Sequence, residues 1–221
     1  DNIDGLRQTV TPTTLGTSYA LDYANDMAKD GDKVTYLSPI ISGFQAGASY
    51  TPHLGSAGSG ANRSDTPNTG VTDLAVRYEG MIGTVGLVTG AGYEASTKGD
   101  REWNLGVDAT VGAFGLGAVY TDANAGDIAG GATNPRLISA DSQTWVLGAD
   151  YTTGPFKLGA SYTNNDTDNF GQVDRFAAGV VYTYGPGMTF RGSVGYSDLN
   201  GDTGVADQDA TTATIGTQVN F

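Results

Sequence analysis

From residue 33 to the last position, apolar and aromatic side chains alternate with small or polar ones in segments of six to thirteen residues. Side chains of a β-strand point alternately to its two faces, so this pattern predicts strands with one apolar and one polar face. Residues 211–221 show the alternation without a break and stop on Phe221. The pattern predicts eleven strands, at residues 33–38, 44–51, 71–79, 82–94, 102–111, 113–121, 142–152, 156–163, 173–184, 188–197 and 211–221.

Two kinds of connection alternate between these segments. The short ones carry Gly or Pro, as a tight turn requires, and read SPIISG, EGM, VG, TGP and YGPG. The others are polar, often acidic and mostly longer, at residues 51–69, 95–100, 122–140, 164–172 and 198–209. Short turns at one end and long loops at the other predict an all-β fold, a transmembrane antiparallel up-and-down β-barrel. A Greek-key sandwich would not sort its connections in this way.

Aromatic residues recur six positions apart within the segments, which keeps both rings on one face. Six residues span about 20 Å along a strand, which after tilt is somewhat less than the height of the apolar band of a membrane barrel, about 25 Å. Aliphatic side chains lie between the rings, as two bilayer interfaces would select. A soluble sandwich, with the rings in its core, is the alternative. The predicted membrane-belt pairs are Phe44 and Tyr50, Phe114 and Tyr120, Trp145 and Tyr151, Phe156 and Tyr162, Phe176 and Tyr182, and Phe190 and Tyr196.

The face opposite the rings carries small residues and charges of both signs. If the rings meet lipid, these charges point into a water-filled interior, because an Arg or Lys facing lipid at the midplane costs about 2–4 kcal/mol. Together they would set a transverse field and an ion preference. By parity the inward cations are Lys33, Arg77, Lys157, Arg175 and Arg191, and the inward acids are Asp73, Glu79, Glu94, Asp108 and Asp150.

Composition limits the other functional classes. The 221 residues carry a formal charge of −13, which argues against a nucleic-acid partner, and 38% hydrophobic residues, which is low for a packed core of this size. There is no Cys, and His53 is the only His, so a catalytic triad or a zinc site has no residues to draw on and we expect no enzyme and no cofactor. Asp198, Asn200, Asp202 and Asp209 have the spacing of a calcium loop, but residue 203 is Thr where such loops need Gly, and we expect no metal.

Residues 1–32 do not continue the strand pattern. Residues 20–29 place Leu21, Ala24, Met27 and Ala28 at near-helical spacing, which predicts a short amphipathic helix. Residues 15–23 also alternate, so a strand is the other interpretation.

The hairpin KVTYLSPIISGFQAGASYTP, with its Ser38–Pro39 turn, Gly43–Phe44 and closing Tyr50, resembles the mid-chain hairpin of Gram-negative trimeric general porins, especially alphaproteobacterial ones. The terminal Phe221 resembles the assembly signal of that family. The resemblance implies a sixteen-stranded homotrimeric barrel in outer-membrane lipid that passes ions and small hydrophilic solutes passively. It also implies that residues 1–32 match the inward-folding constriction loop and residues 33–221 the barrel domain. The acidic face of that loop would be Asp22, Asp26, Asp30 and Asp32, opposed by the inward Arg and Lys.

Strand direction gives a further expectation. The segment 33–38 and the last segment both run toward the short-turn end, so eleven strands cannot close an even-numbered antiparallel barrel. We expect about five strands upstream of those seen here, or a twelve-stranded barrel that uses residues 13–23. The predicted function is a weakly cation-preferring outer-membrane porin with long loops outside the cell and short turns in the periplasm. A non-conducting barrel that acts as an adhesin or structural protein is the alternative.

Overall fold

The computed structural model describes residue 27 and residues 33–52, 70–126 and 140–219. The strands within the three longer ranges form one antiparallel sheet of eleven strands. The strands are β1 (Val34–Leu37), β2 (Phe44–Thr51), β3 (Val71–Ile82), β4 (Val85–Ser96), β5 (Arg101–Val111), β6 (Phe114–Asn124), β7 (Ser142–Thr153), β8 (Phe156–Thr167), β9 (Gly171–Gly185), β10 (Met188–Gly201) and β11 (Gln208–Val219). No described helix is long and apolar enough to cross a membrane.

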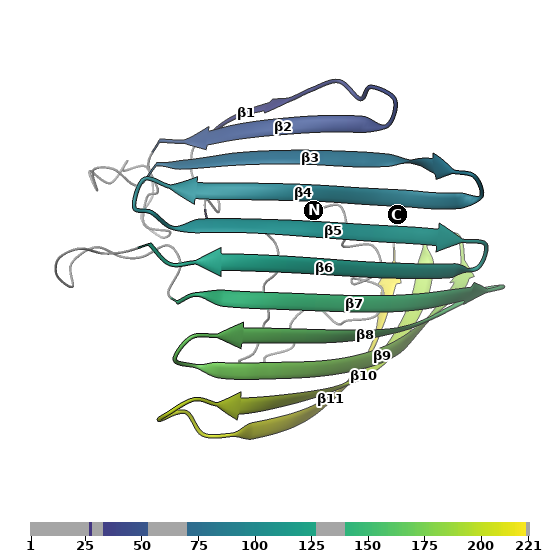
Figure 1. Ribbon diagram of the computed structural model, residues 1–221. Helices are drawn as coiled ribbons and strands as arrows, with labels where there is room; N and C mark the ends of the chain where they lie inside the picture. Colours follow the sequence, from purple (N-terminus) through teal and green to yellow (C-terminus); the bar gives the residue numbers. More distant parts are fainter. Residues whose placement is uncertain (1–26, 28–32, 53–69, 127–139, 220–221) are drawn as a thin grey trace.

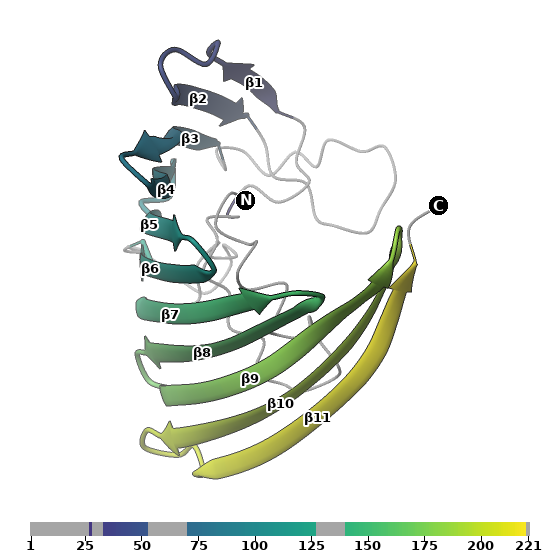
Figure 2. The ribbon, with the colours of Figure 1, turned by 90° about the vertical axis from the view of Figure 1, so that its right-hand side faces the viewer.

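Each strand pairs with its neighbours in sequence, in the order β1 to β11 (Figure 1). The predicted meander of eleven consecutive strands is therefore confirmed. The sheet curls into an open trough, with β1 and β11 at its two edges (Figure 2). These edges do not pair with each other, so the sheet is not closed within the described part of the chain.

The short turns follow the glycine positions closely. β3–β4, β5–β6 and β7–β8 are joined by two-residue loops that begin with Gly83, Gly112 and Gly154, all with φ between 54° and 63°. The second loop residue has no positive φ, which is the pattern of a type II′ hairpin turn. The prediction that EGM, at residues 79–81, makes the first of these turns is wrong. The ladder continues to the pair Ile82–Val85, because Gly83 can adopt the positive φ that the turn requires.

Three of the five polar connections are much shorter than predicted. β4 and β5 are separated by residues 97–100, β8 and β9 by 168–170, and β10 and β11 by 202–207. Segments rich in Asn and Asp read as loops in the sequence, but here they continue the strand ladder, as in the pairs Asn164–Asp174 and Asp198–Asp209. Backbone hydrogen bonding does not depend on which side chains a strand carries, so a strand can extend past its apolar part.

The described sheet is a single layer, and its apolar face is not covered. Leu116 and Val194 are about 60% exposed on this face, at 61% and 58%, and Ile215 is 90% exposed. A sandwich would bury such side chains against a second sheet. The soluble-sandwich alternative therefore fails, and the exposed apolar band is what a lipid-facing wall presents.

Candidate pore wall

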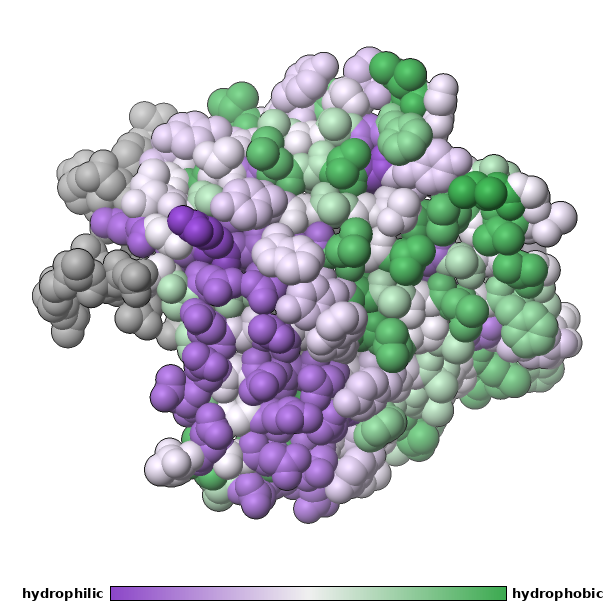
Figure 3. Space-filling view, viewed as in Figure 1, coloured by the Kyte–Doolittle hydropathy of each residue, from purple (hydrophilic) through white to green (hydrophobic). Residues whose placement is uncertain are grey.

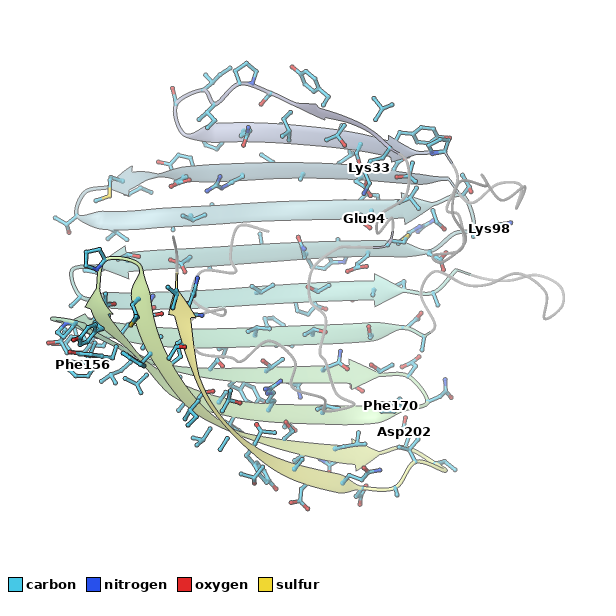
Figure 4. All side chains as sticks on the ribbon, turned by 180° about the vertical axis from the view of Figure 1, so that it is seen from behind. Lys33, Glu94, Lys98, Phe156, Phe170 and Asp202 are labelled. Atoms are coloured by element: carbon cyan, nitrogen blue, oxygen red, sulfur yellow. The ribbon has the colours of Figure 1, made fainter. Side chains whose placement is uncertain are left out.

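The strand register assigns every described strand residue to one of two faces. Across the ladder, Phe44 aligns with Tyr78, and Val194 with Ala178 and Ala213, on the convex outer face. Residues one position away lie on the concave inner face, seen from behind in Figure 4. For the predicted charges, the face inferred from the sequence agrees with this register. Lys33 precedes β1 with the parity of the inner face. The inner face of the strands carries Asp73, Arg77, Glu79, Glu94, Asp108, Asp150, Lys157, Arg175 and Arg191. Their role in conduction remains a prediction.

Charges on the inner face are sorted by strand. The acids lie on β3 to β7, and Glu102 belongs to them although its charge was not among those predicted. In the described strands, Arg77 is the only cation of this acidic sector, and it forms an ion pair with Glu79. The inner face of β8 to β10 carries Lys157, Arg175 and Arg191 and no described acid. The wall therefore has an acidic sector beside a basic one.

The two sectors meet at Asp150 on β7 and Lys157 on β8. Lys157 Nζ lies 3.4 Å from Asp150 Oδ1, and the carboxylate side chain is only 6% exposed. Asp108 on β5 lies within electrostatic reach of both groups. At the far side of the basic sector, the Arg191 guanidinium donates a hydrogen bond to the Gln218 side chain on β11.

Two glutamates face each other near the long-loop end of the wall. Glu94 on β4 and Glu102 on β5 are direct cross-strand partners on the inner face, and both are buried. Glu94 Oε2 accepts a hydrogen bond of 2.9 Å from the backbone N–H of Met27, a residue 67 positions earlier that is 5% exposed. Figure 4 shows Glu94 and Lys33 at this end of the strands and Phe156 at the opposite end. At residue 27, the leading segment therefore contacts the inner wall.

Aromatic side chains form two rows on the outer face, at the depths that the spacing predicts. Near the short turns, Phe114 packs on Tyr151 with ring centroids 4.8 Å apart, and Phe156 packs on Tyr182 at 4.9 Å. Near the long-loop end, Tyr120 packs on Trp145 at 4.4 Å. The twelve predicted belt residues all lie on this face by register, while their contact with lipid stays a prediction. Ring contacts within the rows add Tyr78, Trp103 and Tyr184, which the six-residue rule missed because none of them has an aromatic residue six positions away on its own strand.

We call the aromatic row near the long-loop end the upper row and the row near the short turns the lower row. Beyond the upper row, the outer face becomes polar. Figure 3 shows this change as a hydrophilic area at the long-loop ends of the lower strands in that view, beside the apolar band. Hydrogen bonds connect the aromatic row to this polar area. The Tyr162 hydroxyl donates to Asp174 Oδ1 at 2.5 Å, and the Tyr120 hydroxyl donates to Asp122 Oδ2 at 3.2 Å. The residues of this polar outer band are Asp122, Asn124, Gln143, Asn164, Asp166, Gln172, Asp174, Asp198, Asn200 and Asp209.

The calcium-loop spacing does not correspond to one loop. Asp198 and Asn200 lie on β10 and Asp209 on β11, with only residues 202–207 between the strands. No described group of three or more acidic or His side chains has an arrangement that could hold a metal ion.

Several predicted residues lie outside the described residues. These are Asp22, Asp26, Asp30 and Asp32 of the leading segment, His53, and the terminal Phe221. The helix and strand interpretations of residues 1–32 and the assembly-signal role of Phe221 therefore stay predictions.

Comparison with known families identifies the chain. Residues 2–202 match the family model described as Gram-negative porin, which covers most of the chain. The protein belongs to this family, in agreement with the curved antiparallel wall and its two contrasting faces. No curated protein matches the chain.

Solved structures share the fold at low sequence identity. A porin refined at 1.8 Å resolution superposes with a TM-score of 0.60 at 19% identity, over 85% of this chain and 60% of that one. The anion-selective porin from Comamonas acidovorans gives 0.54 at 15% identity, over 89% and 63%, and a mutant of the Rh. blastica porin gives 0.55 at 19%, over 86% and 54%. The chain thus spans less than two thirds of the length of each of these structures.

Proposed function

We propose that this chain forms part of the wall of a water-filled channel in the outer membrane, through which ions and small hydrophilic solutes diffuse passively. The observation that carries the proposal is the contrast between the two faces of one sheet. Exposed aliphatic side chains framed by aromatic rows suit lipid, whereas charges of both signs on the opposite face require water. Membership of the porin family supports the same function. Catalysis has no part in it.

The acidic sector favours a weak preference for cations. The inner face carries Asp73, Glu79, Glu94, Glu102, Asp108 and Asp150, against Lys33, Arg77, Lys157, Arg175 and Arg191. One structural neighbour, the porin from Comamonas acidovorans, is anion-selective, so the preference proposed for this chain is not a property of the shared fold.

The leading segment, residues 1–32, is proposed to fold inward and narrow the channel. The hydrogen bond from the Met27 N–H to Glu94 on the inner wall, and the burial of Met27, support this arrangement. Asp22, Asp26, Asp30 and Asp32 would then add to the acidic side. Deleting residues 20–30 should raise the single-channel conductance, and an unchanged conductance would contradict the constriction role.

A membrane wall cannot leave strand edges unpaired in lipid. β1 and β11 both run toward the short-turn end, so all-antiparallel closure takes an odd number of further strands. Five such strands would give the sixteen that the porin resemblance implies.

We further propose a homotrimer, with short turns in the periplasm and long loops outside. Native mass spectrometry would test the homotrimer, and protease protection of whole cells would test the orientation.

Conductance in planar lipid bilayers tests the channel itself. The full-length protein, with the further strands that close the barrel, should be purified in detergent and refolded. It should give stepwise currents that scale with salt concentration, and a small reversal potential of the cation-selective sign in a KCl gradient. A protein that inserts as a folded barrel but never conducts would overturn the proposal and favour an adhesin or structural role.

A further inference from the structure

Asp150 occupies the boundary between the two charge sectors in an unusual setting. Its partners in the ladder are glycines on both sides, Gly115 on β6 and Gly159 on β8. Cross-strand neighbours therefore offer no side chain that would push the carboxylate toward the channel axis. Instead it is 6% exposed and lies 3.4 Å from the Lys157 ammonium.

Gly115 provides the space that the carboxylate occupies. A Cβ added at Gly115 would collide with the Asp150 carboxylate, with Asp150 Cγ only 3.0 Å away. At Gly148, also on the inner face, the nearest atom to an added Cβ is the Ala160 carbonyl oxygen at 3.9 Å, an ordinary contact. The same Gly→Ala change therefore displaces a charged group at residue 115 and nothing at residue 148.

We propose that Asp150 is a specificity-determining residue of the channel. The Asp150 carboxylate neutralises the Lys157 ammonium, and the space at Gly115 lets this carboxylate lie flat against the wall. Arg175 and Arg191 are therefore the cations that permeating ions meet in the basic sector. Neither of these arginines forms an ion pair with a described acid. This inference rests on the proposed channel function, and it adds that charge pairing within the wall, as well as the number of charges, sets the ion preference.

The physical reason is the distance dependence of electrostatic effects in water. A close ion pair acts on a passing ion as a weak dipole, whereas an unpaired charge several ångströms from the ion path changes the local ion concentration about twofold or more at low salt. Removing one partner of the pair should therefore have a larger effect than removing both.

Reversal potentials in planar bilayers under a KCl gradient test this for the full chain. Asp150→Asn removes the ion pair of Lys157, with Asp108 still within electrostatic reach, and should shift the permeability ratio about twofold toward anions. Lys157→Gln should shift it by a similar factor toward cations, and the double variant should lie close to the wild type. Gly115→Ala changes no charge but moves the carboxylate off β6 toward the water, and should increase the cation preference. Gly148→Ala is the matched control and should leave it unchanged.

Retarded migration of the unheated protein in gels, checked for each variant, shows that the barrel is folded. The proposal is overturned if folded, conducting Asp150→Asn and Gly115→Ala channels have the reversal potential of Gly148→Ala. It is overturned equally if the double charge variant departs from the wild type as far as either single variant does. A wild type that never conducts would contradict the proposed function instead.

Discussion

Two consecutive residues of β10 meet opposite surroundings. Val194 lies on the outer face, 58% exposed, with Ala178 and Ala213 beside it. Ser193 lies on the inner face between Gly179 and Thr214. Along the sheet, most of the large aliphatic and aromatic side chains lie outside, whereas the inner face carries the charges, many small residues and some buried aliphatic ones.

On the outer face, the usual relation between apolar character and burial is reversed. Val119 and Val146 on the inner face are 6% and 5% exposed, whereas outer-face Leu105 is 53% exposed. In water, full burial of such a side chain stabilises a fold by about 1.5–3 kcal/mol, so a wall that leaves many of them exposed is built for a solvent other than water. Under the proposed channel function, the sheet would obtain its stability from its backbone ladder and from lipid around its outer face.

Placing the same charge on each face should give the largest difference in stability between the two faces. Val194→Arg should destabilise the protein by about 2–4 kcal/mol, because a lipid-facing guanidinium near mid-depth loses its hydration. Ser193→Arg, one residue away, should stay within about 0.5 kcal/mol of the wild type because its side chain reaches water. Urea titrations of folding into phospholipid vesicles measure both, and equal effects would show that the two faces meet the same solvent.

The boundary between the apolar and polar parts of the outer face gives a smaller effect. Tyr162→Phe removes the hydroxyl that donates to Asp174 and should cost about 1 kcal/mol, the usual net value of a hydrogen bond. Tyr182→Phe in the lower row is the control, since its hydroxyl makes no hydrogen bond with a described residue. If both variants lose the same stability in the vesicle titration, the link between belt and polar band has no energetic role.

Ring packing within the upper row should contribute least. A double-mutant cycle of Tyr120→Leu and Trp145→Leu should give a coupling free energy of about 0.5–1 kcal/mol, since the ring centroids are 4.4 Å apart. Trp145 combined with Phe190, a residue of the opposite row, provides a reference pair that should be additive. Coupling of equal size in both cycles would exclude a specific ring contact.

The alternation of side chains along the chain determines much of this protein by itself. Eleven strands, their order, their two faces and the two aromatic rows follow from period-two spacing and Gly-containing turns, because these are local properties of the chain. The parity of Lys157, Arg175 and Arg191 follows in the same way.

Only the tertiary structure decides where the strands end and which charges meet. The ladder runs through Asn164 and Asp198, since backbone pairing continues in segments whose side chains resemble a loop. Glu94 and Glu102, and likewise Asp150 and Lys157, come together through strand register and side-chain direction, which no local pattern encodes. Gly115 reads in the sequence as one of 34 glycines, and its role in seating the Asp150 carboxylate exists only because β6 and β7 align these two residues.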